Sequence, residues 1–199
     1  MMRSGYKFRA KSTCYDGNYF RSKLEARWAV FMDLLGVTYE YERDSAIVGA
    51  GFVEIGYCPD FFLEDLQLYV EIKPRKPNEI EILKAVGWAD YTADVVFFYN
   101  LSLDNGIKVI GEPPLKPLVS LDHYRWCECD RCFKIDITEF GIPECGCYSE
   151  NEFDMMYLGD IPEIDFSRTK NLIDAYKIAK NYNFSTSAKV MMLPGRRAY

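Results

Sequence analysis

The fold of this chain is decided by two stretches, Tyr57-Cys58-Pro59-Asp60-Phe61 and Tyr69-Val70-Glu71-Ile72-Lys73-Pro74. The apolar segments around them, residues 52–63 and 67–73, predict two strands. The polar pair Glu64-Asp65 between these segments predicts the turn of an antiparallel hairpin. Both strands carry charged residues within apolar runs, where an unpaired charge is costly. This combination indicates a functional site built on the hairpin.

The hairpin brings three charged side chains to one face of the sheet. Side chains alternate between the two faces of a strand, so Glu71 and Lys73 point the same way and Ile72 points to the other side. If the chain turns near Asp65-Leu66, Asp60 lies opposite Glu71 and shares its face. The sequence therefore predicts a cluster of Asp60, Glu71 and Lys73.

A helix is expected before the hairpin. Residues 20–36 have apolar side chains at helical spacing. Ser22 is the expected N-cap, and Glu25 three positions later completes a capping-box pattern. Gly36 is a good C-terminal stop for this helix.

The remaining elements of the first hundred residues predict an α/β fold. Residues 37–41 have the β-propensity of a strand. Residues 79–91 predict a helix, which Gly87 weakens, and residues 95–99 predict a buried strand. The order helix, three strands, helix, strand is typical of an α/β arrangement with a mixed sheet.

Two carboxylates and a lysine at strand ends have a clear chemical use. The oxygens of Asp60 and Glu71 suit a hard divalent cation, typically Mg²⁺, with the backbone carbonyl of Ile72 as a further ligand. Such a cation polarises a phosphodiester and lowers the pKa of a bound water. Lys73 can position that water or stabilise the charge that develops on phosphorus. Glu25, on the first helix, adds a carboxylate that could orient water or hold a second metal.

These residues resemble the PD-(D/E)XK nuclease superfamily. Its motif is matched by Pro59-Asp60, ten intervening residues and Glu71-Ile72-Lys73. The segment Ser22-Lys23-Leu24-Glu25-Ala26-Arg27-Trp28 resembles the helix that carries the superfamily's extra glutamate. The family core is a helix, a three-stranded meander, a helix and another strand, which is the order expected above. The resemblance covers roughly residues 20–100.

The resemblance implies a restriction-endonuclease-like core and a Mg²⁺- or Mn²⁺-dependent nuclease that hydrolyses double-stranded or branched DNA. Its catalytic residues would be Glu25, Asp60, Glu71 and Lys73, and its metal ligands Asp60, Glu71 and Ile72. The compact chain looks most like an endonuclease of a phage or mobile element, acting in the host cytoplasm. Cutting both strands would suggest a homodimer, because one such site cuts one strand at a time.

Composition and charge limit the possible functions. The chain is 49% hydrophobic, which is enough to bury a core. It has no apolar run of the ~20 residues that a membrane span needs and no apolar signal segment, so we expect a soluble cytoplasmic protein. The net charge of −6 does not by itself favour nucleic acid.

The N-terminal segment is nevertheless basic. Residues 1–27 carry seven basic and two acidic side chains, a local charge of +5, with aromatic residues between them. Such a segment could follow phosphates and stack on bases, and a solvated N-terminus is equally consistent with it. The charged residues are Arg3, Lys7, Arg9, Lys11, Arg21, Lys23 and Arg27 against Asp16 and Glu25.

Five of the seven cysteines lie between residues 127 and 147. In an intracellular chain, clustered cysteines bind metal more often than they form disulfides. The sequence predicts a structural Zn²⁺ site with the two pairs joined by a short hairpin through residues 133–140, and Gly146 would relieve the tight turn of the second pair. The expected ligands are Cys129, Cys132, Cys145 and Cys147, with Cys127 and His123 as alternatives.

Two other functions remain open at this level. The protein could bind nucleic acid through the same fold and zinc ribbon without cutting it, although a binding-only protein has no need of the Asp60, Glu71 and Lys73 cluster. It could also be a zinc-dependent regulator whose important part is the cysteine segment.

The sequence predicts three parts. Residues 1–118 form the nuclease core and end in a proline-rich linker, residues 119–150 form the zinc-ribbon-like segment, and residues 151–199 contain an acidic connector and a helix near 168–183. The remaining carboxylates fit solvated positions. Those in the first strands are Glu40, Glu42 and Glu54.

Overall fold

A mixed six-stranded sheet forms the centre of the computed structural model, which describes residues 12–50, 53–90, 92–110, 118–119, 124–149, 151–152 and 164–185. The strand order is β10-β9-β8-β7-β6-β3. β7 and β8 are parallel, and the other neighbouring pairs are antiparallel. The strands are β3 (Tyr39–Tyr41), β6 (Phe61–Leu63), β7 (Leu68–Lys73), β8 (Val95–Tyr99), β9 (Ile107–Ile110) and β10 (Leu118–Val119). The predicted α/β class with a mixed sheet is confirmed.

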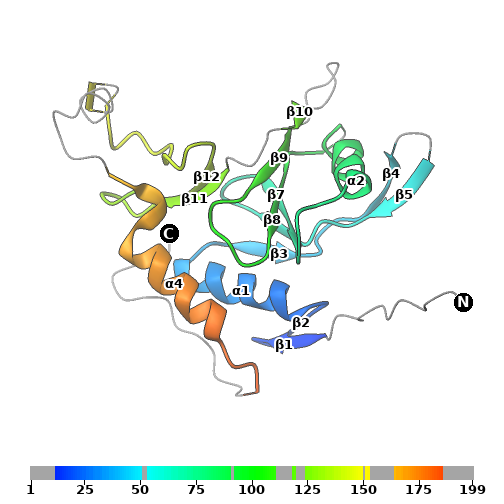
Figure 1. Cartoon of the computed structure of the whole chain (residues 1–199), viewed down its shortest axis with the longest axis horizontal. Coiled ribbons are helices and arrows are strands. Elements are labelled where there is room, and N and C mark those ends of the chain that lie inside the picture. The colour runs from blue at the N-terminus through cyan, green and yellow to red at the C-terminus, as the bar shows by residue number, and fades with distance from the viewer. Residues whose placement is uncertain are drawn as a thin grey trace, which may run out of the picture.

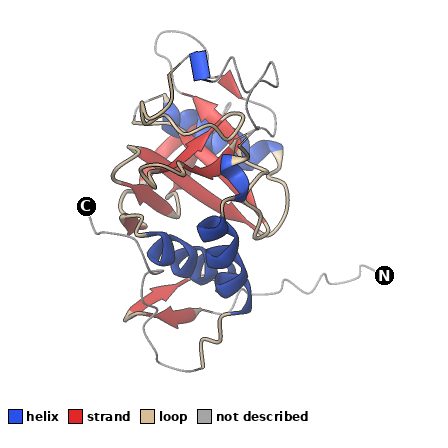
Figure 2. Cartoon of the chain, turned by 90° about the vertical axis from the view of Figure 1, so that its left-hand side faces the viewer, coloured by secondary structure: helices blue, strands red, loops and turns tan. Residues whose placement is uncertain are grey.

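Helices cover both faces of the sheet (Figure 1). α1 (Lys23–Leu35) and α4 (Lys170–Asn181) lie side by side on one face, and α2 (Glu79–Ala89) lies on the other. α4 forms in the region where the sequence predicts a C-terminal helix, and a short 3-10 helix, η1 (Phe166–Arg168), precedes it. Figure 2 shows the pair of helices between the sheet and a small hairpin.

Side-chain alternation along β7 separates two hydrophobic cores. Leu68, Val70 and Ile72 pack in the core that contains α1. Tyr69 packs in the core that contains Trp88 of α2. Ile72 therefore points to the face expected for it, because successive side chains of a strand alternate.

α1 begins and ends as the sequence predicts. The Ser22 side chain accepts a hydrogen bond from the Glu25 backbone N–H at 3.1 Å, which satisfies one of the free donors at the helix start. Gly36 ends the helix with φ 67°, a left-handed conformation that glycine adopts without steric cost. The Glu25 carboxylate bonds to the backbone N–H of Arg21 instead of that of Ser22, so the capping box is shifted by one residue.

Residues 52–63 do not form the single strand that the sequence predicts. They contain β5 (Val53–Tyr57), which pairs with β4 (Ala46–Ala50) in a separate hairpin, followed by β6 in the central sheet. Pro59 lies at the break between β5 and β6. Proline has no N–H to donate to a sheet ladder, which explains why the strand is interrupted there.

The β4–β5 hairpin packs against α2. A Cβ atom on Gly87 of α2 would lie 2.3 Å from the carbonyl oxygen of Gly49 in β4. Only glycine permits this approach of helix to strand. The residue that weakens α2 by propensity is therefore required by its packing.

A second small hairpin, which the sequence did not lead us to expect, precedes α1. It consists of β1 (Thr13–Tyr15) and β2 (Asn18–Phe20). Tyr15 and Phe20 are buried in the core beside α1, so these two aromatic rings are not free to stack on bases. The basic residues Arg3, Lys7, Arg9 and Lys11 lie outside the described residues.

The cysteine segment contains a hairpin, but it is formed by other residues than those expected. β11 (Arg125–Glu128) pairs with β12 (Ile135–Thr138), so the hairpin starts before the first cysteine pair instead of running through residues 133–140. Trp126 of β11 is fully buried against Trp28 of α1, with ring centroids 5.8 Å apart. This hairpin therefore contributes Trp126 and Ile137 to the main core, while Cys127 packs with Cys129, Tyr148 and Phe166 in a small cluster of its own.

The other segments expected from the sequence lie mostly outside the described residues. These are residues 111–117 of the linker and 153–163 of the acidic connector. Among the helices that the structure describes, none has both the length and the apolar composition that crossing a bilayer requires.

Candidate active site and metal centres

Asp60 and Glu71 lie opposite each other where β6 meets β7, in the register expected from the sequence. Phe61 pairs with Val70, and the Asp60 N–H donates to Glu71 Oε2 at 3.2 Å. Asp60 Oδ2 accepts a hydrogen bond from the Ile72 N–H at 2.7 Å. The two carboxylates are only 3% and 4% exposed, so they are held in place and shielded from bulk water.

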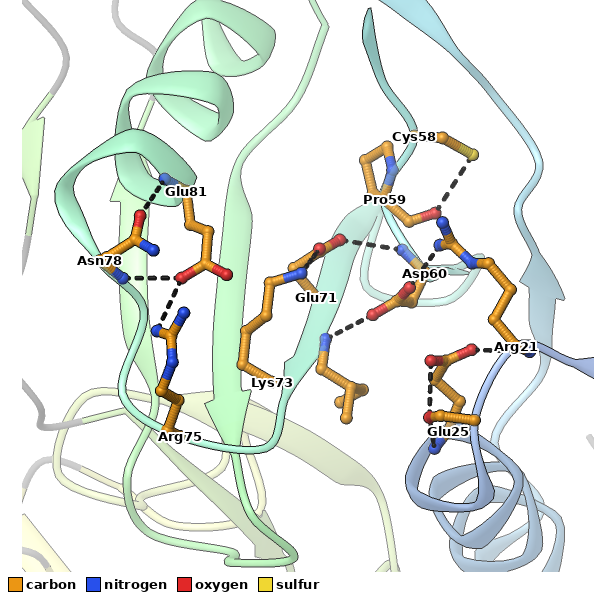
Figure 3. Close-up of polar contacts among 12 residues, drawn as sticks. Arg21, Glu25, Cys58, Pro59, Asp60, Glu71, Lys73, Arg75, Asn78 and Glu81 are labelled. Carbon is orange, nitrogen blue, oxygen red and sulfur yellow. Dashed lines mark hydrogen bonds and ion pairs between the residues drawn. The ribbon is translucent and has the colours of Figure 1, made fainter. Parts of the chain in front are cut away.

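Two cationic side chains bind the remaining carboxylate oxygens. Lys73 Nζ forms a short ion pair with Glu71 Oε1, and Arg21 Nη2 lies 2.7 Å from Asp60 Oδ1. Figure 3 shows these side chains pointing toward one another between β7 and the start of α1. All four oxygens of the Asp60 and Glu71 carboxylates therefore have a donor within the protein.

Glu25 stands beside this cluster and does not touch its carboxylates in the described residues. Its carboxylate accepts hydrogen bonds from Ser22 Oγ at 2.6 Å, the Tyr41 hydroxyl at 2.6 Å and the Arg21 backbone N–H at 3.1 Å. The Tyr41 hydroxyl also accepts a bond from the Arg21 N–H at 2.9 Å. Glu25 thus holds the backbone that carries Arg21, which fits a positioning residue better than a metal ligand.

Glu42 has a partner that its expected solvent-facing position did not suggest. Its carboxylate forms a short ion pair with Arg21 Nε. Its backbone N–H donates to the Asp60 carbonyl at 2.9 Å, and its φ of 49° is in the left-handed region. The expectation that Glu42 is only a solvated strand residue is wrong, because this turn brings it to the edge of the site.

Tyr57 places a buried hydroxyl beside the carboxylates, in reach of Glu71. Burial raises the pKa of this hydroxyl, and the negative charges of Glu71 and Asp60 raise it further.

Burial disfavours the charged forms of the two carboxylates in this cluster. Burial raises the pKa of Asp60 well above its usual value, and the charges of Glu71 and Glu25 add to the effect. Burial also raises the pKa of Glu71, against the opposing charges of Lys73 and Arg21. Although burial alone would lower it, the pKa of Lys73 is raised by Glu71 and Asp60. Asp60 and Glu71 therefore form an oxygen-donor set that fits a hard divalent cation.

This electrostatic cost leads to a prediction for Asp60→Asn. A carboxyl whose pKa is raised by folding opposes folding above that pKa, and the penalty disappears as pH falls and the carboxyl becomes protonated in both states. We expect the variant to be more stable than the wild type at pH 8 by on the order of 1 kcal/mol, about 2–4 °C in melting temperature for a chain of this size. The difference should shrink toward pH 5.

Thermal melts in buffer without added magnesium measure this difference. Asp65→Asn, which changes an exposed aspartate in the β6–β7 turn, is the control and should melt like the wild type at both pH values. A lower melting temperature for Asp60→Asn at pH 8 would contradict the assigned electrostatic cost.

The second candidate centre is made of cysteines. Their sulfur atoms lie within 4.8 Å of one another and could bind a metal such as zinc, which prefers four ligands in a tetrahedron. Gly146 has the left-handed φ, 71°, that the short second pair was expected to need. The four residues are Cys129, Cys132, Cys145 and Cys147, the set expected from the sequence.

Cys127 is not part of this group. Its sulfur lies 3.6 Å from the Asp136 carbonyl oxygen and 3.6 Å from the Thr138 hydroxyl. Burial raises the pKa of the Cys127 thiol to about 12. Its choice as an alternative ligand is wrong, because the thiol is turned into the β11–β12 hairpin. His123, the other alternative, lies outside the described residues.

The sequence did not indicate four residues of the candidate site: Arg21, Tyr41, Glu42 and Tyr57. In the sequence Arg21 is one charge of a basic segment, although its place directly before the N-cap of α1 puts it beside Glu25. Tyr41 ends the strand that neighbours β6, a position that the predicted sheet order could have indicated. For Tyr57 the sequence contains no such signal, because its position depends on the break in the strand at Pro59.

The start of α2 adds charged groups near Lys73. Asn78 caps this helix, with Glu81 completing a capping box. Arg75 pairs with Glu81 at 3.1 Å, and Figure 3 shows this group on the Lys73 side of the cluster.

Comparison of the chain with protein-family models, with curated proteins and with solved structures finds no match.

Proposed function

We propose that this protein is a divalent-metal-dependent nuclease that hydrolyses DNA phosphodiester bonds, an endonuclease of the PD-(D/E)XK type. The observation that carries the proposal is the contact between Asp60, Glu71 and Lys73. Two buried carboxylates lie side by side, the Glu71 carboxylate accepting from the Asp60 backbone N–H and pairing with Lys73, and together they form a cation-binding group. Natural cores seldom bury charge without a function for it.

The arrangement of elements supports the same class. α1, β3, β6, β7, α2 and β8 follow the order helix, three strands, helix, strand, with the β4–β5 hairpin inserted between β3 and β6. The proline-aspartate precedes β6, and the Glu-x-Lys sequence ends β7. We therefore propose a restriction-endonuclease-like core for residues 20–100.

Each residue has a role that follows from its contacts. Asp60 and Glu71 would hold Mg²⁺ or Mn²⁺, with the Ile72 carbonyl as a further oxygen. The bound cation would polarise the phosphodiester and activate water. Lys73, held by Glu71, places a positive charge where negative charge develops on the phosphate. Ile72 donates its N–H to Asp60 and fixes that carboxylate, and Glu25 fixes the backbone of Arg21.

The cysteine site is proposed to hold a structural zinc ion. Four thiolates fill the tetrahedron and leave no open position for substrate. Its first pair, Cys129 and Cys132, lies in the β11–β12 turn and its second pair follows β12, so a bound ion would fix both ends of that hairpin.

Cleavage of a panel of DNA substrates tests the proposed function. The purified full chain is incubated with supercoiled, linear, branched and single-stranded DNA, with Mg²⁺, Mn²⁺ or no added divalent cation. We expect cleavage of at least one substrate only when Mg²⁺ or Mn²⁺ is present. Binding without cleavage of any substrate would contradict the proposal and favour a non-catalytic nucleic-acid-binding protein.

A further inference from the structure

Arg21 occupies a bridging position among the carboxylates of the candidate active site. Its Nη2 lies 2.7 Å from Asp60 Oδ1, and its Nε pairs with Glu42. A guanidinium that joins two carboxylates in this way takes the place that a metal ion takes when it bridges two acidic ligands. In two-metal nuclease sites the ions lie about 3.5–4 Å apart.

The backbone around Arg21 is fixed, so this position is built into the fold. The Arg21 N–H donates to both Glu25 Oε2 and the Tyr41 hydroxyl. Glu42 is held on the other side by its bond to the Asp60 carbonyl. Its left-handed backbone conformation, φ 49°, is costly for a residue with a side chain. This strain is compensated by contacts that keep Glu42 against Arg21.

The ion pairs of the site leave one net negative charge. Three carboxylates, Glu42, Asp60 and Glu71, pair with two cationic side chains, Arg21 and Lys73, so three negative charges minus two positive charges leave −1. One divalent cation would change this to +1, whereas a second would raise it to +3. Charge therefore opposes a second divalent ion while Arg21 is present.

Asp60 can hold both Arg21 and a metal ion. A carboxylate offers about four lone-pair positions, and Arg21 and the Ile72 N–H use one on each oxygen. The Arg21 side chain is also 55% exposed, so part of it faces solvent and can meet a phosphate. Glu25, considered from the sequence as a ligand of a second metal, instead has its carboxylate engaged with the segment that carries Arg21.

We propose that Arg21 is the resident second cation of the site, so that the protein uses one divalent metal ion and presents a guanidinium to the phosphate where a two-metal nuclease presents its second ion. This inference rests on the proposed metal-dependent function. It assigns to Arg21 a substrate-positioning role that composition and motif spacing did not indicate.

Metal stoichiometry tests this inference independently of cleavage. The zinc-containing full chain is titrated with Mn²⁺, and free Mn²⁺ is counted by electron paramagnetic resonance. We expect one Mn²⁺ per wild-type chain and two per chain of Arg21→Ala, with the second ion broadening the spectrum through coupling to the first. Arg21→Gln, which keeps donors for Asp60 but loses the charge, should also bind two ions and serves if Arg21→Ala does not fold.

Two control variants separate this effect from a general loss of charge. Arg21→Lys restores the charge and should bind one ion. Arg168→Ala removes an arginine of similar exposure, which pairs with Asp104 at 2.6 Å far from the cluster in sequence, and should also bind one. Two ions in the wild type, or one ion in both Arg21→Ala and Arg21→Gln, would overturn the inference and leave the proposed function intact. A wild type that binds no Mn²⁺ would overturn both.

Discussion

Lys73→Met should lower the rate of magnesium-dependent DNA cleavage by about 100- to 1,000-fold, the usual effect of removing one preorganised electrostatic group from an active site. Lys73 is held by Glu71 and is partly exposed at the end of β7. Methionine keeps much of the volume of the side chain but removes its charge. Because Lys73 repels a cation, Mn²⁺ binding by the variant should be retained. Single-turnover cleavage and Mn²⁺ titration measure the two effects separately.

Glu71→Gln should lose both DNA cleavage and Mn²⁺ binding, since it removes a carboxylate that is proposed to hold the metal.

Lys108→Met is the matched control for Lys73→Met. Lys108, on β9, has a side chain with the same exposed fraction as that of Lys73, 21%, and pairs with Asp94 at 2.9 Å. The Lys108→Met protein should cleave DNA at the wild-type rate. Wild-type cleavage by Lys73→Met would show that the assigned role of this lysine is wrong.

The sequence predicts the hairpin of this site well because its pattern is local. Strand alternation is strict, so the position of Ile72 on one face places Glu71 and Lys73 on the other. The turn between Leu63 and Leu68 then sets the register that brings Asp60 to Glu71. The helix start at Ser22 is equally local, because its capping pattern lies within four consecutive residues.

The parts that the sequence did not predict depend on tertiary contacts. β5 reads as a continuation of β6 until Pro59 is considered, and its partner β4 is recognised only from the pairing itself. Gly87 appears unfavourable in a helix because propensity takes no account of the strand that approaches it. The place of Arg21 in the site depends on the packing of α1 against the sheet, which fixes the backbone before the helix. No spacing rule encodes this contact.

The boundary of the cysteine segment was also set by packing. Knuckle spacing identifies Cys129 and Cys132 from the chain alone. The hairpin that carries them begins at Arg125, because Trp126 packs against both Trp28 and Phe31 of α1. An isolated zinc ribbon and one docked by a buried tryptophan can have the same cysteine pattern.

Replacement of two cysteines of the proposed zinc site, Cys129→Ser with Cys145→Ser, is the prediction with the largest expected effect on stability. We expect the variant to lose one equivalent of zinc and to melt on the order of 10 °C lower. Loss of a structural metal is among the few changes that cost several kcal/mol, and each kcal/mol corresponds to about 2–4 °C in a chain of this size. Metal analysis of the purified protein and thermal melts measure the two quantities.

The effect should extend beyond the cysteine segment because the hairpin is tied to the core at two points. Trp126 packs on Trp28, and Glu128, which is 1% exposed, accepts hydrogen bonds from the Thr169 hydroxyl and from Asn171 Nδ2 at the start of α4. Loss of the metal frees the turn that follows Glu128, so α4 loses part of its support. Tryptophan fluorescence should therefore shift toward that of an exposed indole.

Cys127→Ser provides the control for these cysteine changes. Cys127 is buried next to the cluster, but its sulfur points to Asp136 and Thr138, where a serine hydroxyl can also hydrogen-bond. This variant should keep its zinc and its tryptophan spectrum. If it loses zinc while the double variant keeps it, the ligand set is wrong. If the double variant loses zinc but melts like the wild type, the metal does not hold the hairpin to the core, because the contacts of Trp126 and Glu128 are then sufficient without it.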